Sequence, residues 1–216
     1  MLIAGLDEAG RGPLAGPVVA AAVIFPEGYA DPEIRDSKQL SPRNRETLAG
    51  RIRQAATAWA VVAVGHRRIE ELNIRQASLR AMELALARLK VVPDLVLIDG
   101  NVPITTNLPQ RTVVQGDRKH VQISAASIIA KVFRDELMAI CDARYPGYAF
   151  SQHAGYGTPA HREAIIRLGP CPIHRRTFQG VREYIGGARE TPPGLRAEPR
   201  VAVPSSPPAP PARPPR

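Results

Sequence analysis

The sequence predicts an α/β fold, because short apolar runs of strand composition alternate with longer stretches whose apolar residues recur at helical spacing. With 216 residues the chain is long enough for one domain with a sizeable core and an appendage. Residues 187–216 hold ten of the 22 prolines and no aromatic residue. We therefore expect a folded domain over 1–186 and a disordered Pro/Arg-rich tail over 187–216.

The first two expected strands flank a tight turn. Residues 2–6 form a short apolar run that ends at Asp7 and Glu8, and residues 18–25 form a second run rich in valine. Side chains alternate between the faces of a strand, so we expect both acids at the exit of the first strand, where they could serve one site. Two adjacent desolvated anions need a compensating cation, which a divalent metal could supply. The alternative is that Asp7 caps a turn and Glu8 is solvated.

The turn after these acids, GRGPLAG, matches the loose dinucleotide-binding pattern G-x-G-x-x-G/A. That fingerprint should open a helix that receives pyrophosphate at its N-terminus, whereas Pro13 and Pro17 lead here into a valine-rich strand. We therefore reject a dinucleotide site. What remains is a turn at which Gly10, Arg11 and Gly12 let the backbone approach a ligand closely.

The other elements follow from composition and spacing. Ser41 and Pro42 have the N-cap and N1 order of a helix start. We expect strands at 2–6, 18–25, 58–64, 95–98 and 112–114, and helices at 42–56, 74–89 and 123–144, with another helix starting at Thr158-Pro159. The longest helix should turn one apolar face inward: Ile129, Phe133, Leu137, Ile140 and Cys141. Its first residues, SAASIIAK, are small enough for close packing against a sheet.

Two later strands also end near an acid beside a glycine, at Asp99 and at Asp117. Turn formation alone would explain either of them. Asp135 in the long helix is a rival to Asp117, although a helical acid between Arg134 and Glu136 is more often a surface residue.

The net charge of +9 favours a polyanionic partner such as nucleic acid. The tail carries five arginines and two acids, so +6 remains with residues 1–186. The segment from His153 to Arg176 is basic and partly aromatic, which suits contact with a sugar-phosphate backbone. Its histidines lack the spacing of metal ligands on one helical face, so we expect them to be substrate-side or structural.

Several classes of protein are disfavoured. No apolar run approaches the length of a membrane span, and no signal peptide precedes Asp7, so we expect a soluble, cytoplasmic protein. Cys141 and Cys171 have neither a disulfide framework nor zinc-site spacing.

Five motifs occur in order along the chain: AGLDEAGRGPLAGPVVAAAVI, DSKQLS, LIDGN, GD followed by ISAASIIAKVFRD, and QHAGYGTPAH. Together they resemble bacterial ribonuclease HII, the type 2 ribonuclease H, over residues 2–178. The resemblance implies the ribonuclease H-like fold, with a mixed central sheet of about five strands flanked by helices and a small helical C-terminal segment. The tail is not part of it.

The resemblance also implies an activity. Such enzymes hydrolyse the RNA strand of RNA–DNA hybrids and cut 5′ of ribonucleotides embedded in duplex DNA. They do so by two-metal-ion phosphodiester hydrolysis with Mn or Mg, leaving a 5′-phosphate and a 3′-hydroxyl. The implied catalytic and metal-binding residues are Asp7, Glu8, Asp99 and Asp117, which decides against Asp135.

The implied partners are RNA–DNA hybrids and DNA containing single ribonucleotides, bound by a monomer. The implied substrate-binding residues are Gly10, Arg11 and Gly12, near the 2′-hydroxyl, and Tyr156, which stacks near the RNA–DNA junction. We add Lys38 as a phosphate contact, with a solvated lysine as its alternative. A non-catalytic nucleic-acid-binding protein of the same fold, or a related nuclease acting on DNA junctions, would be the competing functions.

Overall fold

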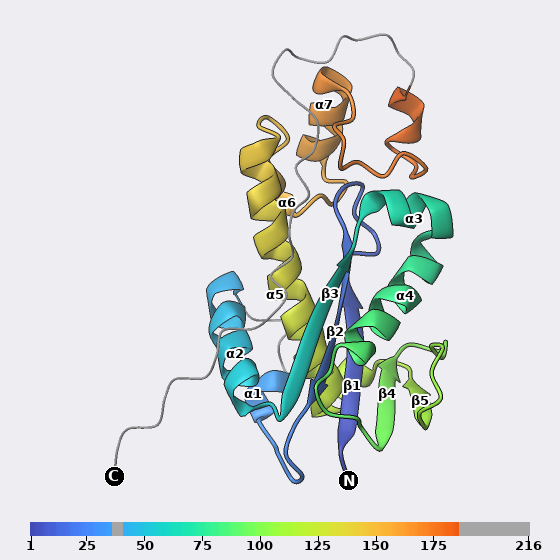
Figure 1. Ribbon diagram of the computed structural model, residues 1–216. Coiled ribbons are helices and arrows are strands. Elements are labelled where there is room, and N and C mark those ends of the chain that lie inside the picture. Colours follow the sequence, from blue (N-terminus) through green and yellow to red (C-terminus); the bar gives the residue numbers. More distant parts are fainter. Residues whose placement is uncertain (36–40, 186–216) are drawn as a thin grey trace. The chain divides into compact units, whose positions relative to one another are not determined.

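A mixed sheet of five strands, in the order β3-β2-β1-β4-β5, organises the computed structural model, which describes residues 1–35 and 41–185 (Figure 1). The strands are β1 (Ile3–Ala9), β2 (Val18–Ile24), β3 (Ala58–Val64), β4 (Leu95–Asp99) and β5 (Gln110–Val113). β1, β2 and β3 are antiparallel neighbours, whereas β4 and β5 run parallel to β1. The predicted mixed sheet is confirmed.

The helices are α1 (Pro32–Arg35), α2 (Pro42–Ala55), α3 (His66–Leu72), α4 (Ile74–Ala87), α5 (Val121–Arg144), α6 (Phe150–His153) and α7 (Pro159–Leu168), with 3-10 turns η2 (Gly116–Arg118) and η3 (Arg182–Tyr184). Both predicted proline starts are confirmed: Ser41 caps α2 and Thr158 caps α7, each accepting a main-chain N–H at 3.3 Å. The short elements α1, α3 and α6 were not expected, because a helix of one or two turns shows little periodicity.

Helices cover both faces of the sheet (Figure 1). The α4 face holds a core that includes Leu6, Val62 and Met82, and the α5 face holds one that includes Val19 and Ile129. All seven residues of β2 are buried, which explains why its sequence is continuously apolar instead of alternating.

The N-terminal part of α5 lies directly on β1. A Cβ atom added to Gly5 would stand 2.2 Å from the main-chain carbon of Gln122, so only glycine fits at this crossing. The next turn of α5 is small and buried at Ser124, Ala125 and Ala126, as the composition predicted. This close approach brings the middle of α5 beside the acidic end of β1.

A small C-terminal segment packs around its own apolar cluster, which includes Tyr148, Phe150 and Ile165. It joins the glycine-rich turn after β1 through the N–H of Leu14, which donates to the carbonyl of Gly155 at 2.8 Å. The predicted helical C-terminal segment is thus confirmed. The predicted tail over 187–216 lies outside the described residues and stays a prediction.

The predicted inner face of α5 is wrong at Ile140, which is 65% exposed. Arg134 and Met138 are buried in its place, at 1% and 0% exposure. The reason is that the second half of α5 packs against the turn after β1 and against the C-terminal segment. Carbonyl groups of that turn accept hydrogen bonds from the buried Arg134. Within residues 1–35 and 41–185, no helix is long and apolar enough to cross a membrane.

Candidate active site

Asp7 and Glu8 lie within β1, opposite Ala21 and Ala20 of β2, so the expected position at a strand exit is wrong. The reason is that β1 pairs with β2 as far as Ala9 but with β4 only as far as Leu6. Beyond Leu6 the β4 side of β1 is therefore open. The two acids start on opposite faces of the strand but flank the same open edge.

Asp99 is the last residue of β4, and the pairing of Leu6 with Ile98 carries it alongside Asp7. Its Oδ1 accepts a hydrogen bond from the N–H of Gly116 at 2.7 Å, which ties η2 to the end of β4. Asp117 follows in η2, which begins after Gln115, a residue in the left-handed backbone conformation. Elements far apart in the sequence thus bring Asp7, Glu8 and Asp99 to one edge of the sheet, and Asp117 follows directly after Gly116, whose N–H is bonded to Asp99.

The electrostatics of this edge favour a bound cation. Burial, followed by the charges of Glu8 and Asp99, raises the pKa of Asp7 well above its ordinary value, against a hydrogen bond from Ser127. Burial also raises the pKa of Glu8. The ion pair with Arg11 at 3.3 Å lowers this pKa in part, and the charge of Asp99 raises it further. The ionised form of each carboxylate is therefore destabilised first by burial and then by its acidic neighbours, with Arg11 offsetting part of this at Glu8. Hard divalent cations prefer oxygen ligands of this kind.

The donor set therefore fits Mg²⁺ or Mn²⁺ by its chemistry. Among the residues described, no group of three or more His, Cys, Asp or Glu side chains is arranged so that it could hold a metal ion. The carboxylates are clustered near one edge, but a metal ion would still have to draw them together.

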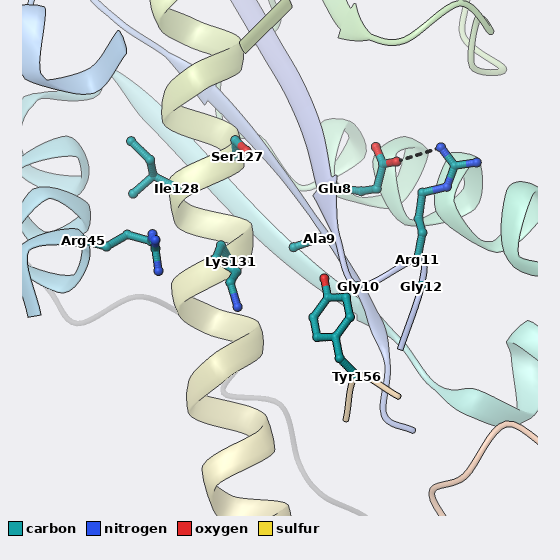
Figure 2. A pocket seen from close by; sticks show the side chains of 10 residues that line it. All are labelled: Glu8, Ala9, Gly10, Arg11, Gly12, Arg45, Ser127, Ile128, Lys131 and Tyr156. Carbon is teal, nitrogen blue, oxygen red and sulfur yellow. Dashed lines mark hydrogen bonds and ion pairs between the residues drawn. The ribbon is translucent and has the colours of Figure 1, made fainter. Parts of the chain in front are cut away.

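A cleft of about 400 Å³ lies beside Glu8 (Figure 2). One wall is the end of β1 and the glycine turn, and the other comes from α5 and α2, with Tyr156 at the side (Figure 2). The lining residues are Glu8, Ala9, Gly10, Arg11, Gly12, Arg45, Ser127, Ile128, Lys131 and Tyr156. The structure thus brings five of the predicted site residues to one cleft.

Tyr156 is 42% exposed, so its ring is available to a ligand. The guanidinium of Arg134 lies 5.7 Å from the ring centre. The main chain of Tyr156 is held at both ends: its N–H donates to the carbonyl of His153 at 2.9 Å, and its carbonyl accepts from Nδ1 of His161 at 2.9 Å. The ring therefore stands on an ordered backbone.

Two buried histidines, His161 and His174, form a neutral hydrogen-bonded chain behind Tyr156. Nδ1 of His161 donates to a carbonyl, so its Nε2 must accept from Nε2 of His174 at 3.0 Å. Nδ1 of His174 in turn accepts from the N–H of Cys171 at 2.9 Å. Burial lowers the pKa of His161 to about 4 and, together with His161, that of His174 to about 3. These two histidines are structural.

Acid should therefore destabilise the domain through these two residues. Their pKa values are lower in the folded chain than the ordinary 6.5, so their stabilising contribution is complete above pH 6.5 and is lost as the pH falls toward 4. We expect a loss on the order of 2 kcal/mol per histidine between pH 7 and pH 5, measured by denaturant unfolding. His174→Asn should flatten this dependence, and an unchanged slope would contradict the neutral pair.

The other predicted residues have mixed outcomes. Lys38 lies outside the described residues. Asp135 forms an ion pair with Lys131 at 2.5 Å on α5. Sequence reasoning missed Arg45, Ser127 and Lys131 as lining residues, because only the packing of α2 and α5 turns them toward β1.

Sequence reasoning also missed two buried arginines, Arg134 and Arg175, which are 1% and 0% exposed. Their side chains donate to main-chain carbonyls of the turn after β1. Nothing in a sequence separates such an arginine from a solvated one, since its partners are backbone groups.

Comparison with known proteins identifies relatives of this chain. The family model described as ribonuclease HII matches residues 4–181. A ribonuclease HII of Geobacter metallireducens is 54% identical over 183 residues, which cover 85% of this chain and 86% of the relative. The crystal structure of ribonuclease H2 from Pyrococcus horikoshii OT3 is similar with a TM-score of 0.75 and 28% identity, covering 85% of this chain and 97% of that one.

A more distant solved structure, Bst ribonuclease HIII in complex with Mn²⁺, shares the fold with a TM-score of 0.59 at 19% identity, covering 85% of this chain and 69% of that one. The family match spans most of the chain and includes the acidic edge of the sheet, the glycine turn and Tyr156. The chain therefore belongs to the ribonuclease HII family.

Proposed function

We propose that this metal-dependent endoribonuclease cuts its substrate at the cleft beside β1, with Asp7, Glu8, Asp99 and Asp117 as the catalytic carboxylates. The observation that carries this assignment is the open edge beyond Leu6, where a buried Asp7 shares its surroundings with Glu8 and Asp99. Buried carboxylates with raised pKa values beside a cleft are typical of functional sites.

The four acids would hold the divalent metal, either Mn²⁺ or Mg²⁺, of which Mn²⁺ is the ion bound by the similar ribonuclease HIII. A metal bound there would supply activation of a water for in-line attack on phosphorus and stabilisation of the leaving 3′-oxygen. The chain itself orients the carboxylates: the hydroxyl of Ser127 and the N–H of Glu8 donate to Asp7, and the N–H of Gly116 donates to Asp99.

Selectivity for ribonucleotides would come from the turn of Gly10, Arg11 and Gly12. A reader of the 2′-hydroxyl must come close to the sugar, and a turn with two glycines permits main-chain groups to do so. Gly12 has room for such an approach, since the nearest atom to a Cβ built there is a ring carbon of Tyr156 at 3.8 Å.

The opposite wall would hold the phosphate backbone. Arg45 and Lys131 line it with positive charge, opposite the acidic edge. Phosphate contacts of this kind give affinity without sequence preference, so binding should weaken as salt is raised. We further propose that the enzyme acts as a monomer and is cytoplasmic, on hybrids and on DNA containing single ribonucleotides.

A labelled duplex with one embedded ribonucleotide tests the proposed function directly. We expect incision 5′ of the ribonucleotide with Mn²⁺ or Mg²⁺, leaving a 3′-hydroxyl, and no incision in chelator, in all-DNA duplex or in RNA duplex. Metal-independent binding without incision would instead indicate a non-catalytic nucleic-acid-binding protein. Incision of all-DNA junctions would indicate a junction nuclease.

Tyr156→Ala should impair incision at a single ribonucleotide in DNA by roughly tenfold, because base stacking on an exposed ring is lost. Steady-state kinetics on that duplex and on a long hybrid would measure the effect. Tyr184→Ala is the matched control, since Tyr184 is equally exposed, at 41%, but lies in η3. Unchanged kinetics in Tyr156→Ala would remove this ring from the site.

A further inference from the structure

Arg175 is fully buried, and its guanidinium donates four hydrogen bonds, all to main-chain carbonyl oxygens of the turn after β1. The carbonyls of Gly10 and Arg11 accept at 2.6 and 2.8 Å. Those of Gly16 and Pro17 accept at 3.0 and 3.1 Å. One side chain from the C-terminal segment therefore holds both ends of a turn more than 150 residues away.

Arg134 of α5 supports the same turn from a second direction. Its Nε donates to the carbonyl of Pro17 at 3.0 Å, and its Nη2 donates to that of Ala15 at 3.2 Å. A Cβ atom on Gly10 would stand 2.0 Å from this Nε, so the turn and the guanidinium are in direct contact.

The geometry of the peptide unit gives this clamp a consequence. In a planar trans peptide, the carbonyl of one residue and the N–H of the next point in opposite directions. Because Arg175 holds the carbonyls of Gly10 and Arg11 on the buried side, the N–H groups of Arg11 and Gly12 point away from it. Gly10, Arg11 and Gly12 line the cleft, whereas Arg175 does not.

We propose that Arg175 is a positioning residue for ribonucleotide selection: by clamping the carbonyls of Gly10 and Arg11, it aims the N–H groups of Arg11 and Gly12 into the cleft at the 2′-hydroxyl. This inference rests on the proposed function of the cleft. On this inference, Arg175 lies outside the cleft but fixes the orientation of the N–H groups that contact the substrate.

The chemistry of the clamp requires arginine. A guanidinium presents five N–H donors in a rigid plane, which lets one group serve several carbonyls in fixed directions, whereas an ammonium is compact and rotatable. Burial of a charge without a carboxylate is costly and is offset here by the carbonyl dipoles. Burial, followed by the nearby charge of Arg134, lowers the pKa of Arg175 to about 9, so the group is still charged at neutral pH.

Arg175→Lys tests the clamp, because it keeps the charge but not the planar fork. Arg175→Lys and its control, Arg167→Lys, are each made in the Asp7→Asn chain, which should bind without cutting. Dissociation constants are measured in Mg²⁺ for a duplex with one ribonucleotide and for an all-DNA duplex of the same sequence. We expect the preference for the ribonucleotide to fall at least about tenfold, with all-DNA affinity unchanged. Arg167→Lys is the matched control, since Arg167 also donates to a carbonyl, that of Gly147 at 3.2 Å, away from the turn. Full preference retained in Arg175→Lys would overturn the inference.

A second measurement covers the case in which Arg175→Lys does not fold. In the Asp7→Asn chain with Arg175 intact, the ¹⁵N–¹H resonances of Arg11 and Gly12 should shift on binding the ribonucleotide duplex and shift less with the all-DNA duplex. Identical shifts with both duplexes would overturn the inference. Absence of incision by the wild-type chain would instead overturn the proposed function and this inference with it.

Discussion

Asp7→Asn is expected to reduce cleavage of an RNA–DNA hybrid by at least about a thousandfold, while affinity for the duplex survives. The carboxylate lies at the open edge of β1 between Glu8 and Asp99, so its loss removes an oxygen ligand from the centre of the proposed metal site. Single-turnover cleavage and duplex binding, both at ordinary Mn²⁺ or Mg²⁺ concentration, measure the two effects. Retained turnover would contradict the metal-binding role of Asp7.

The same substitution should raise the unfolding free energy of the metal-free protein at pH 7. The pKa of Asp7 is higher in the folded chain than its ordinary value, so ionisation at neutral pH favours unfolding. This destabilisation is absent below the pKa of the unfolded carboxyl and sets in as the pH rises above it. An amide cannot ionise and escapes it.

Asp135→Asn is the control for both effects. Asp135 pairs with Lys131 on a half-exposed part of α5, so its neutralisation should bring no gain in stability and leave most of the activity. Denaturant unfolding in chelator compares the two variants. Equal stability changes in both would show that Asp7 is not strained by its acidic neighbours.

Gly10→Ala is expected to destabilise the domain by about 3 kcal/mol or more and to abolish selective cleavage. Gly10 has a φ of +95°, which L side chains rarely adopt, and a Cβ atom would stand 2.0 Å from Nε and 2.5 Å from Cδ of Arg134. The guanidinium is fully buried and cannot move aside without giving up its carbonyl partners on the turn. Denaturant unfolding at constant pH measures the loss.

Gly12→Ala is the matched control for stability. The nearest atom to its Cβ would be a ring carbon of Tyr156 at 3.8 Å, an ordinary contact, so unfolding should change by no more than about 0.5 kcal/mol. If both substitutions were tolerated equally, the contact between Gly10 and Arg134 would not hold the turn.

Local patterns were sufficient to predict most elements of this fold. The strand over residues 58–64 has the predicted bounds, and the helix predicted over 42–56 ends one residue earlier as α2 (Pro42–Ala55). Proline starts and apolar runs are read from neighbouring residues, which is why they succeed. Local patterns failed at Ile140, which is exposed, and at α3, which they did not predict.

The sequence predicted the residue types of the candidate site but not their positions in the fold. Acids after apolar runs and a glycine turn were visible as residue types, and the resemblance to ribonuclease HII assigned their roles. Their positions were not visible: Asp7 and Glu8 were expected beyond β1 and lie within it. The end of β1 is set by the strand that pairs with it, and β2 pairs with β1 further along the chain than β4 does.

The sequence by itself determined the order of the elements, the small residues that let α5 lie on β1 and the acids available for a metal site. Only the tertiary structure decided that β1 lies between β2 and β4, which sets Asp99 beside Asp7. It alone also showed that Arg175 clamps the glycine turn and that His161 and His174 are neutral. The physical reason is that these features depend on burial and on backbone partners far away in the chain, which local sequence does not encode.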